Sequence, residues 1–117
     1  MIVNTGLQHI ADQLAEKNQA VMSHMAVGMG TAAENAGDNA LQTETARVAL
    51  TAITRNDKKV MYVGTFDAGV GTGTLTEVGL FNAASSGDLL SRIVFPAKNK
   101  SPNDTLQITI EHTFTNL

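Results

Sequence analysis

Two glycine-rich segments are the first places in this chain where residue types and spacing suggest chemistry. Residues 28–33 read Gly-Met-Gly-Thr-Ala-Ala, which matches the short form of the fingerprint that binds the pyrophosphate of a dinucleotide. That chemistry also needs a helix opening at the end of the motif and a second parallel strand ending in an acidic residue. Residues 34–39 have no amphipathic pattern, and residues 69–74 lack the Lys-Ser/Thr ending of a phosphate loop. We therefore expect neither segment to bind a nucleotide.

The side chains that usually carry catalysis or hold metal ions form no known constellation. His9, His24 and His112 are far apart in the sequence, and none has the spacing of a metal site. No nucleophile-elbow sequence supports a serine nucleophile. Asp57 and Asp67 lie in turn sequences, where aspartate is expected for its local hydrogen bonding. The sequence predicts a protein that is not an enzyme and that needs no cofactor or metal ion.

Four charged residues are predicted to have structural roles. Glu77 lies in the middle of the apolar run 75–82, where an unpaired carboxylate would be costly. It therefore either points to solvent or pairs with a cation such as Arg92 or Arg47. Glu44 and Arg47 are three residues apart and can form a second pair, which contributes little if it is exposed.

A hairpin surrounds Glu77. Residues 75–82 and 89–96 are strand-forming runs, and the small and turn-favouring residues 83–88 between them supply the chain reversal. The second strand is expected to end at Pro96. Gly79 inside the first strand gives up side-chain packing, which indicates a bulge or the close approach of another backbone.

Further strands are predicted on both sides of this hairpin. Residues 21–27 form a short strand, and residues 47–53 and 60–66 form a hairpin around a turn at 56–59. Residues 105–114 alternate between apolar and polar side chains, so one face of this strand packs inward.

One helix is predicted over residues 5–17. Five apolar residues share one face at the helical period: Leu7, Ile10, Ala11, Leu14 and Ala15. Thr5 followed by Gln8 is a capping-box pattern at its start. The fold class is therefore mainly β, an antiparallel β-sandwich of about six strands with one N-terminal amphipathic α-helix that covers an open side.

Residues 28–45 are predicted to form a long polar arm. They show neither helical nor strand periodicity, and Met29 and Leu41 are their only large apolar side chains. Connections of this length without regular structure usually have a function or order on binding. We expect this arm, including Gly28, Met29, Gly30 and Leu41, to order against an adjacent subunit or a second protein.

The composition limits the remaining possibilities. At 117 residues the chain has the length of one domain, with the sandwich over 47–114. Its net charge is −3 and its Lys and Arg are dispersed, so nucleic acid is not an expected partner. The chain has no Cys, hence no disulfide framework. No apolar run is long enough to span a membrane, and the N-terminus lacks the pattern of a signal peptide.

Five segments in this order resemble a known family. They are 4–6 (NTG) opening the helix, 26–31 (AVGMGT), 41–47 (LQTETAR), 76–82 (TEVGLFN) and 90–96 (LSRIVFP). The chain resembles the N-terminal domain of phage tail-collar fibre proteins, and also small standalone virion proteins of tailed phages built on the same pattern. The resemblance covers nearly the whole chain.

This resemblance implies a structural function. In the fibre proteins the domain fastens the fibre to the baseplate or collar. Because this sequence stops at Leu117, we expect a virion structural protein that forms or decorates a collar, tail or baseplate ring, or an adaptor. The expected partners are copies of itself in cyclic symmetry and other virion proteins, with no small-molecule substrate. By the same resemblance, Glu44, Arg47 and Glu77 would hold the loop and the hairpin in place.

The expected location is the virion, assembled in the host cytoplasm. Two alternatives remain open. A capsid decoration (cement) protein belongs to the same class but lies on the head. A carbohydrate-binding β-sandwich module belongs to another class, and it usually presents exposed aromatic platforms. Tyr62 and four Phe offer few such platforms here.

Overall fold

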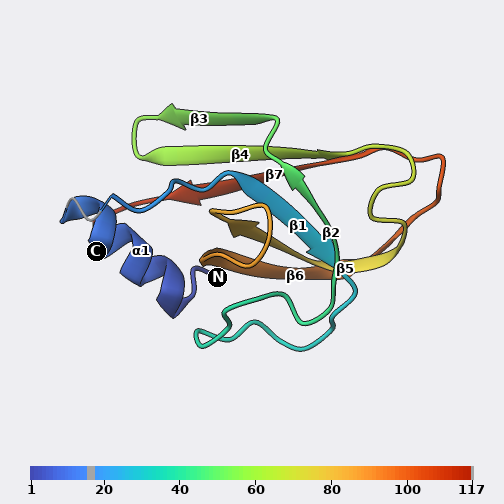
Figure 1. Ribbon diagram of the computed structural model, residues 1–117, viewed down its shortest axis with the longest axis horizontal. Helices are drawn as coiled ribbons and strands as arrows, with labels where there is room; N and C mark the ends of the chain where they lie inside the picture. Colours follow the sequence, from blue (N-terminus) through green and yellow to red (C-terminus); the bar gives the residue numbers. More distant parts are fainter. Residues whose placement is uncertain (16–17, 117) are drawn as a thin grey trace.

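Seven strands form two antiparallel sheets in the computed structural model, which describes residues 1–15 and 18–116 (Figure 1). The elements are α1 (Asn4–Leu14), β1 (His24–Gly28), β2 (Glu44–Ala49), β3 (Ala52–Asn56), β4 (Lys59–Phe66), β5 (Gly73–Phe81), β6 (Leu89–Lys100) and β7 (Leu106–Thr113). Sheet A has the order β2-β1-β5-β6 and sheet B the order β3-β4-β7. The predicted mainly β sandwich with one N-terminal helix is confirmed, with seven strands where about six were expected.

The additional strand comes from a corner in the segment 47–53. This segment was expected to be one strand, but it divides between the two sheets. The Leu50 N–H donates to the carbonyl of Ser23 beside β1, and the next N–H, that of Thr51, donates to the carbonyl of Val63 in β4. The chain therefore crosses from sheet A to sheet B here. The predicted hairpin and its turn are confirmed as β3 and β4.

The β5–β6 hairpin is also confirmed, but its second strand does not end at Pro96. In the register, Leu75 pairs with Lys98 and Glu77 pairs with Val94, so β6 holds extra residues opposite Thr76. Pro96 lies in this bulge, where its missing N–H removes no ladder hydrogen bond. A proline that looked like a strand terminator instead occupies an irregularity within a longer strand.

Sheet A is covered on both faces. One face packs on sheet B and buries the large apolar side chains of the inter-sheet core, which include Met25, Val27, Phe66, Leu75, Val78, Leu80 and Ile110. The other face buries a second, smaller cluster formed by Val3, Ala26, Leu41, Phe81 and Leu89. Sheet A lies between sheet B and the arm (Figure 1). This arrangement explains why the side chains of β5 are buried on both faces.

The start of α1 differs from the predicted capping box. Val3 is the N-cap residue, and no side chain caps the helix. The Thr5 hydroxyl instead donates to the carbonyl of Leu89 at 2.8 Å. A Cβ added to Gly6 would lie 2.1 Å from the carbonyl oxygen of Leu90, so the first turn of the helix touches the backbone of β6. The Asn-Thr-Gly sequence therefore docks the helix on β6.

The predicted apolar face of α1 faces the sandwich only in part, through Ile10, which packs against the inter-sheet core. Gly6 and His9 are the buried residues of the helix, whereas Leu7 and Leu14 are 55% and 83% exposed. The close contact at Gly6 sets the rotation of the helix on β6 and leaves these leucines in solvent. The last two residues of the predicted helix, 16 and 17, lie outside the described residues. In the described part of the chain, no helix is long and apolar enough to cross a membrane.

Candidate functional site

A carboxylate buried beneath the arm is the centre of the candidate site. Glu77 has no exposed surface. Its Oε1 accepts hydrogen bonds from Arg92 Nε (2.9 Å) and the Gln42 N–H (2.8 Å), and its Oε2 accepts from the N–H groups of Gly30 and Thr43 (both 2.8 Å). The four bonds use the full acceptor capacity of a carboxylate. Of the two alternatives for Glu77, the structure shows the pair with Arg92.

The hydrogen bonds outweigh the cost of burial. Burial alone would raise the pKa of Glu77, but the bonds from the Thr43 N–H, the Arg92 guanidinium and the Gln42 and Gly30 N–H groups lower the pKa below its ordinary value. The charged carboxylate is thus the form that this site stabilises. A proton donor or acceptor in catalysis needs a pKa near the working pH. The lowered pKa of Glu77 instead fits a carboxylate that stays charged and has a structural role.

Arg92 extends the network from Glu77 to the arm. Its side chain is buried, and its Nη1 donates to Asp38 Oδ2 at 3.1 Å and to the carbonyl of Ala33 at 3.3 Å. Its Nη2 donates to the carbonyl of Ala32 at 2.9 Å. The guanidinium is planar and offers donors in a fixed fork, so one side chain holds several arm groups at once. We call this set, Glu77, Arg92, Asp38 and the arm backbone groups that they bind, the clamp.

Two glycines make room for the clamp. A Cβ on Gly28 would lie 2.2 Å from the carbonyl oxygen of Thr43 and 2.6 Å from Glu77 Oε2. A Cβ on Gly30 would lie 2.4 Å from Gln42 Cβ and 2.5 Å from Glu77 Oε2. The Gly-Met-Gly sequence that resembles a dinucleotide fingerprint therefore lets the arm backbone approach a carboxylate of its own chain.

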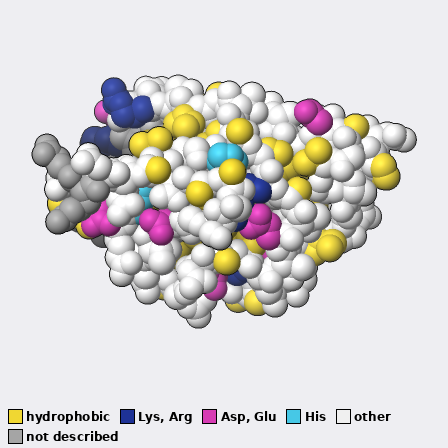
Figure 2. Space-filling model, in the orientation of Figure 1, with side chains coloured by type: hydrophobic (Ala, Val, Ile, Leu, Met, Phe, Trp, Pro, Cys, Tyr) yellow, Lys and Arg dark blue, Asp and Glu magenta, His cyan; other side chains and the backbone are white. Residues whose placement is uncertain are grey.

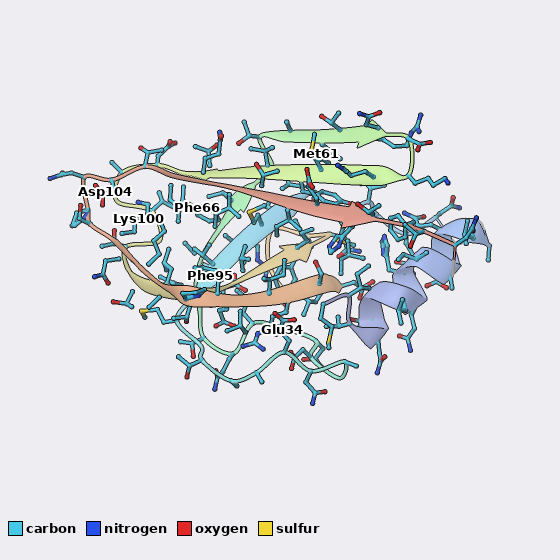
Figure 3. The ribbon with its side chains drawn as sticks, turned by 180° about the vertical axis from the view of Figure 1, so that it is seen from behind. Glu34, Met61, Phe66, Phe95, Lys100 and Asp104 are labelled. Atoms are coloured by element: carbon cyan, nitrogen blue, oxygen red, sulfur yellow. The ribbon has the colours of Figure 1, made fainter. Side chains whose placement is uncertain are left out.

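Within the single chain the arm packs on its own sheet, and its further contact with an adjacent subunit or a second protein stays a prediction. Leu41 is 7% exposed and belongs to the second apolar cluster. Its Cδ2 would lie 2.9 Å from a Cβ at Gly79, which explains why β5 has a glycine there. Glu34, in the arm beside β6 (Figure 3), accepts a hydrogen bond from the Val94 N–H at 2.9 Å. Met29, by contrast, is 45% exposed.

Glu44 and Arg47 form a second, separate pair. Arg47 donates from Nε and Nη2 to the two carboxylate oxygens of Glu44, at 3.0 and 2.7 Å. Its Nη1 donates to the carbonyls of Ala83 (2.9 Å) and Ser86 (2.8 Å) in the β5–β6 turn. The guanidinium carbon lies 3.7 Å from the centroid of the Phe81 ring. Arg47 is 8% exposed, so this pair is less exposed than the sequence suggested.

The hydrogen bonds of the three histidine rings involve neither one another nor the side chains of the clamp. His112 Nε2 lies 2.9 Å from Ser91 Oγ, and His24 Nδ1 lies 2.8 Å from Ser23 Oγ. His9 Nδ1 is buried without a hydrogen-bond partner. Among residues 1–15 and 18–116, no group of three or more His, Cys, Asp or Glu side chains is placed to hold a metal ion.

Sequence reasoning missed partners that come from distant segments, two from the arm and one from β5. Asp38 and Glu34 lie in a segment without periodicity, and Phe81 looked like an ordinary strand residue. Each is joined to its partner across a long stretch of chain, as Asp38 is to Arg92 over 54 residues. No local signal in the sequence marks such contacts.

The hydrogen bonds of Glu77 join four of the five segments that suggested a family resemblance, because its partners Arg92, Gly30, Gln42 and Thr43 lie in three of the others. The family model described as "Phage tail-collar fibre protein, N-terminal" matches residues 1–114. The chain belongs to this family. The comparison with curated proteins found no match. As a member of the tail-collar fibre family, the chain is a structural protein of a phage tail that associates with other virion proteins and is located in the virion.

Proposed function

We propose that this tail-collar fibre domain is a non-enzymatic building block that forms or decorates a collar, tail or baseplate ring, or serves as an adaptor to one. The clamp holds the arm as a rigid part of the subunit. A groove between α1 and sheet B contacts the neighbouring virion protein. In this function the Glu77–Arg92 and Glu44–Arg47 pairs are structural, and the outward side of the arm, including Met29, is available for contacts between subunits.

The observation that carries this proposal is an apolar groove at the end of the sandwich where α1 lies. The groove has a volume of about 250 Å³, and its lining includes His9, Ile10, Tyr62, Leu90 and His112. Three further lining residues are largely exposed: Leu14 (83%), Val21 (66%) and Phe114 (46%). Exposed apolar side chains gathered around one groove indicate a protein contact surface.

Charge and family both point to a protein as the occupant of this groove. The chain has 8 Lys and Arg against 11 Asp and Glu, and on the face drawn in Figure 2 the basic side chains form small separate groups. A phosphate backbone would need a continuous basic surface. Association with other virion proteins is what the family provides, and a tail location is favoured over the capsid-decoration alternative.

The experiment compares two serine variants in phage that lack the native gene copy. Leu14→Ser combined with Val21→Ser replaces the two most exposed apolar residues that line the groove, and Ile53→Ser is the control, since Ile53 is also exposed (50%) but lies on β3. We expect both proteins to fold by circular dichroism, and only the groove variant to be lost from purified tails by immunoblotting. Normal incorporation of the groove variant, or its detection on heads by immunogold labelling, would contradict the proposal.

A further inference from the structure

The four edge strands of the two sheets differ in how well they are protected from further pairing. On β6, the Arg92 N–H donates to the carbonyl of Met1 at 3.0 Å and the Val94 N–H donates to Glu34. Pro96 has no N–H to offer. Bulges, prolines and covering segments are the usual means of blocking an edge. The outer edge of β6 is therefore closed to another strand.

Strand β7 is an open edge. It has 8 residues, against 6 in β2 and 5 in β3, and its register with β4 has no bulge. It holds no proline and no Lys or Arg, and its one acidic residue is Glu111. Long, regular edges without such protection are templates for strand addition.

The hydrogen-bond pattern shows which residues of β7 face outward with their backbone. The Phe114 N–H donates to the carbonyl of Lys58 at 2.9 Å, next to the pair Lys59–Thr113. Because inward and outward groups alternate in an antiparallel ladder, the even-numbered residues of β7 bond to β4. The N–H and C=O groups of Gln107, Thr109 and Glu111 therefore point away from the sheet.

An apolar gap lies beside this edge, between the two sheets. It has a volume of about 430 Å³, and its lining includes Ile93 and Phe95 of β6 and Leu106 and Ile108 of β7. These four side chains are only partly buried. A strand added to β7 would place alternate side chains over this gap and remove apolar surface from water.

We propose that β7 pairs with β7 of a second copy of this chain, antiparallel and across a two-fold axis at Thr109. A two-fold interface is self-complementary, so each copy supplies the strand that the other lacks. Sheet B then continues as β3-β4-β7-β7-β4-β3 through the dimer. This inference deepens and rests on the assembly function proposed above.

The side chains of β7 favour this register. With Thr109 opposite itself, Glu111 lies opposite Gln107 of the second copy, and Ile108 lies opposite Ile110. Opposed apolar pairs stabilise an antiparallel ladder, and like charges directly opposite destabilise it. Shifting the axis to Ile110 would place Ile108 opposite His112, and an axis at Glu111 would bring two carboxylates together.

A cysteine scan tests the two-fold axis. Because the chain has no Cys, Thr109→Cys gives one thiol per subunit. Residues in a hydrogen-bonded antiparallel pair have Cα atoms about 5.5 Å apart, within the range that a disulfide bridges. Thr54→Cys, an exposed threonine on the β3 edge, is the control. Under mild oxidation we expect a reducible dimer for Thr109→Cys and markedly less dimer for Thr54→Cys.

A charge variant tests the same axis without covalent chemistry. Thr109→Lys puts two ammonium groups opposite each other, and we expect dimerisation to weaken about fivefold in sedimentation, with Thr54→Lys unchanged. Equal cross-linking of both cysteine variants, or a native protein that is monomeric at all concentrations, would overturn the two-fold pairing. If Thr109→Lys still enters purified tails as a monomer, the pairing fails while the proposed tail function stands.

Discussion

Arg92 Nε donates a 2.9 Å hydrogen bond to Glu77 Oε1 where neither side chain is more than 2% exposed. In the β5–β6 register Glu77 lies opposite Val94 and Arg92 lies opposite Gly79, so the two residues meet diagonally across adjacent strands, near the β6 bulge and under the arm. A buried pair of this kind contributes little compared with apolar residues of the same shape, but removing one partner leaves the other uncompensated. Removing either partner is therefore expected to loosen the arm and to destabilise the fold.

Glu77→Gln is expected to lower the free energy of unfolding by about 3–5 kcal/mol at neutral pH, because it leaves Arg92 with one carboxylate fewer in a buried site. In the native protein the pKa of Glu77 is lowered in the fold, from an ordinary value of 4.5. Its contribution is therefore fully present above pH 4.5 and is lost as the pH falls through the folded pKa. Urea denaturation from neutral to acid pH should show a shallower acid loss in the variant. Identical acid profiles would contradict this role.

Gly30→Ala is expected to displace the arm, because the new Cβ would meet both Gln42 and a Glu77 oxygen. Overpacking of this kind typically costs about 1–3 kcal/mol. Gly37→Ala is the matched control in the same arm, since its Cβ would meet only the side-chain oxygen of Asn35, at 3.2 Å. Hydrogen exchange should show faster exchange at the Thr43 N–H in the Gly30 variant alone. Equal exchange in the two variants would argue that the arm does not depend on the clamp.

Arg47→Lys is expected to destabilise the fold by about 1–2 kcal/mol, because an ammonium cannot hold Glu44 and the two carbonyls of the β5–β6 turn at once. Glu44→Gln should cost less, since Glu44 is 33% exposed. Thermal unfolding of both variants gives the comparison. A larger effect for Glu44→Gln would show that the turn contacts of Arg47 are unimportant.

His112 is expected to make stability depend on pH in a range separate from that of Glu77. Burial of the ring, with a smaller effect from the N-terminal ammonium, lowers the pKa of His112 from 6.5. Stability is therefore highest above pH 6.5 and falls below it, because the unfolded chain takes up the proton more readily. His112→Gln keeps a hydrogen bond to Ser91 and should flatten the change between pH 7.5 and about pH 5.5. If urea denaturation shows the same pH dependence of the free energy of unfolding in His112→Gln, another group causes that pH dependence.

Much of the fold follows from local patterns in the sequence. Alternation predicted the strand 105–114, turn residues predicted both hairpins, and helical period predicted α1. Local rules failed where tertiary contacts decided the outcome. Leu14 has the period of a core residue but lies in solvent, because Gly6 sets how α1 rests on β6. Pro96 ended a strand in the prediction, but a bulge accommodates it.

For the candidate site, the sequence by itself determined that Glu77 either points to solvent or pairs with a cation, because an unpaired carboxylate buried within an apolar strand is costly. It named Arg92 and Arg47 without choosing between them. Only the tertiary structure decided for Arg92, added Asp38, and turned the glycines at 28 and 30 into space for the carboxylate. The physical reason is that a residue's chemistry is local, whereas the partners that satisfy it come from segments brought together by folding.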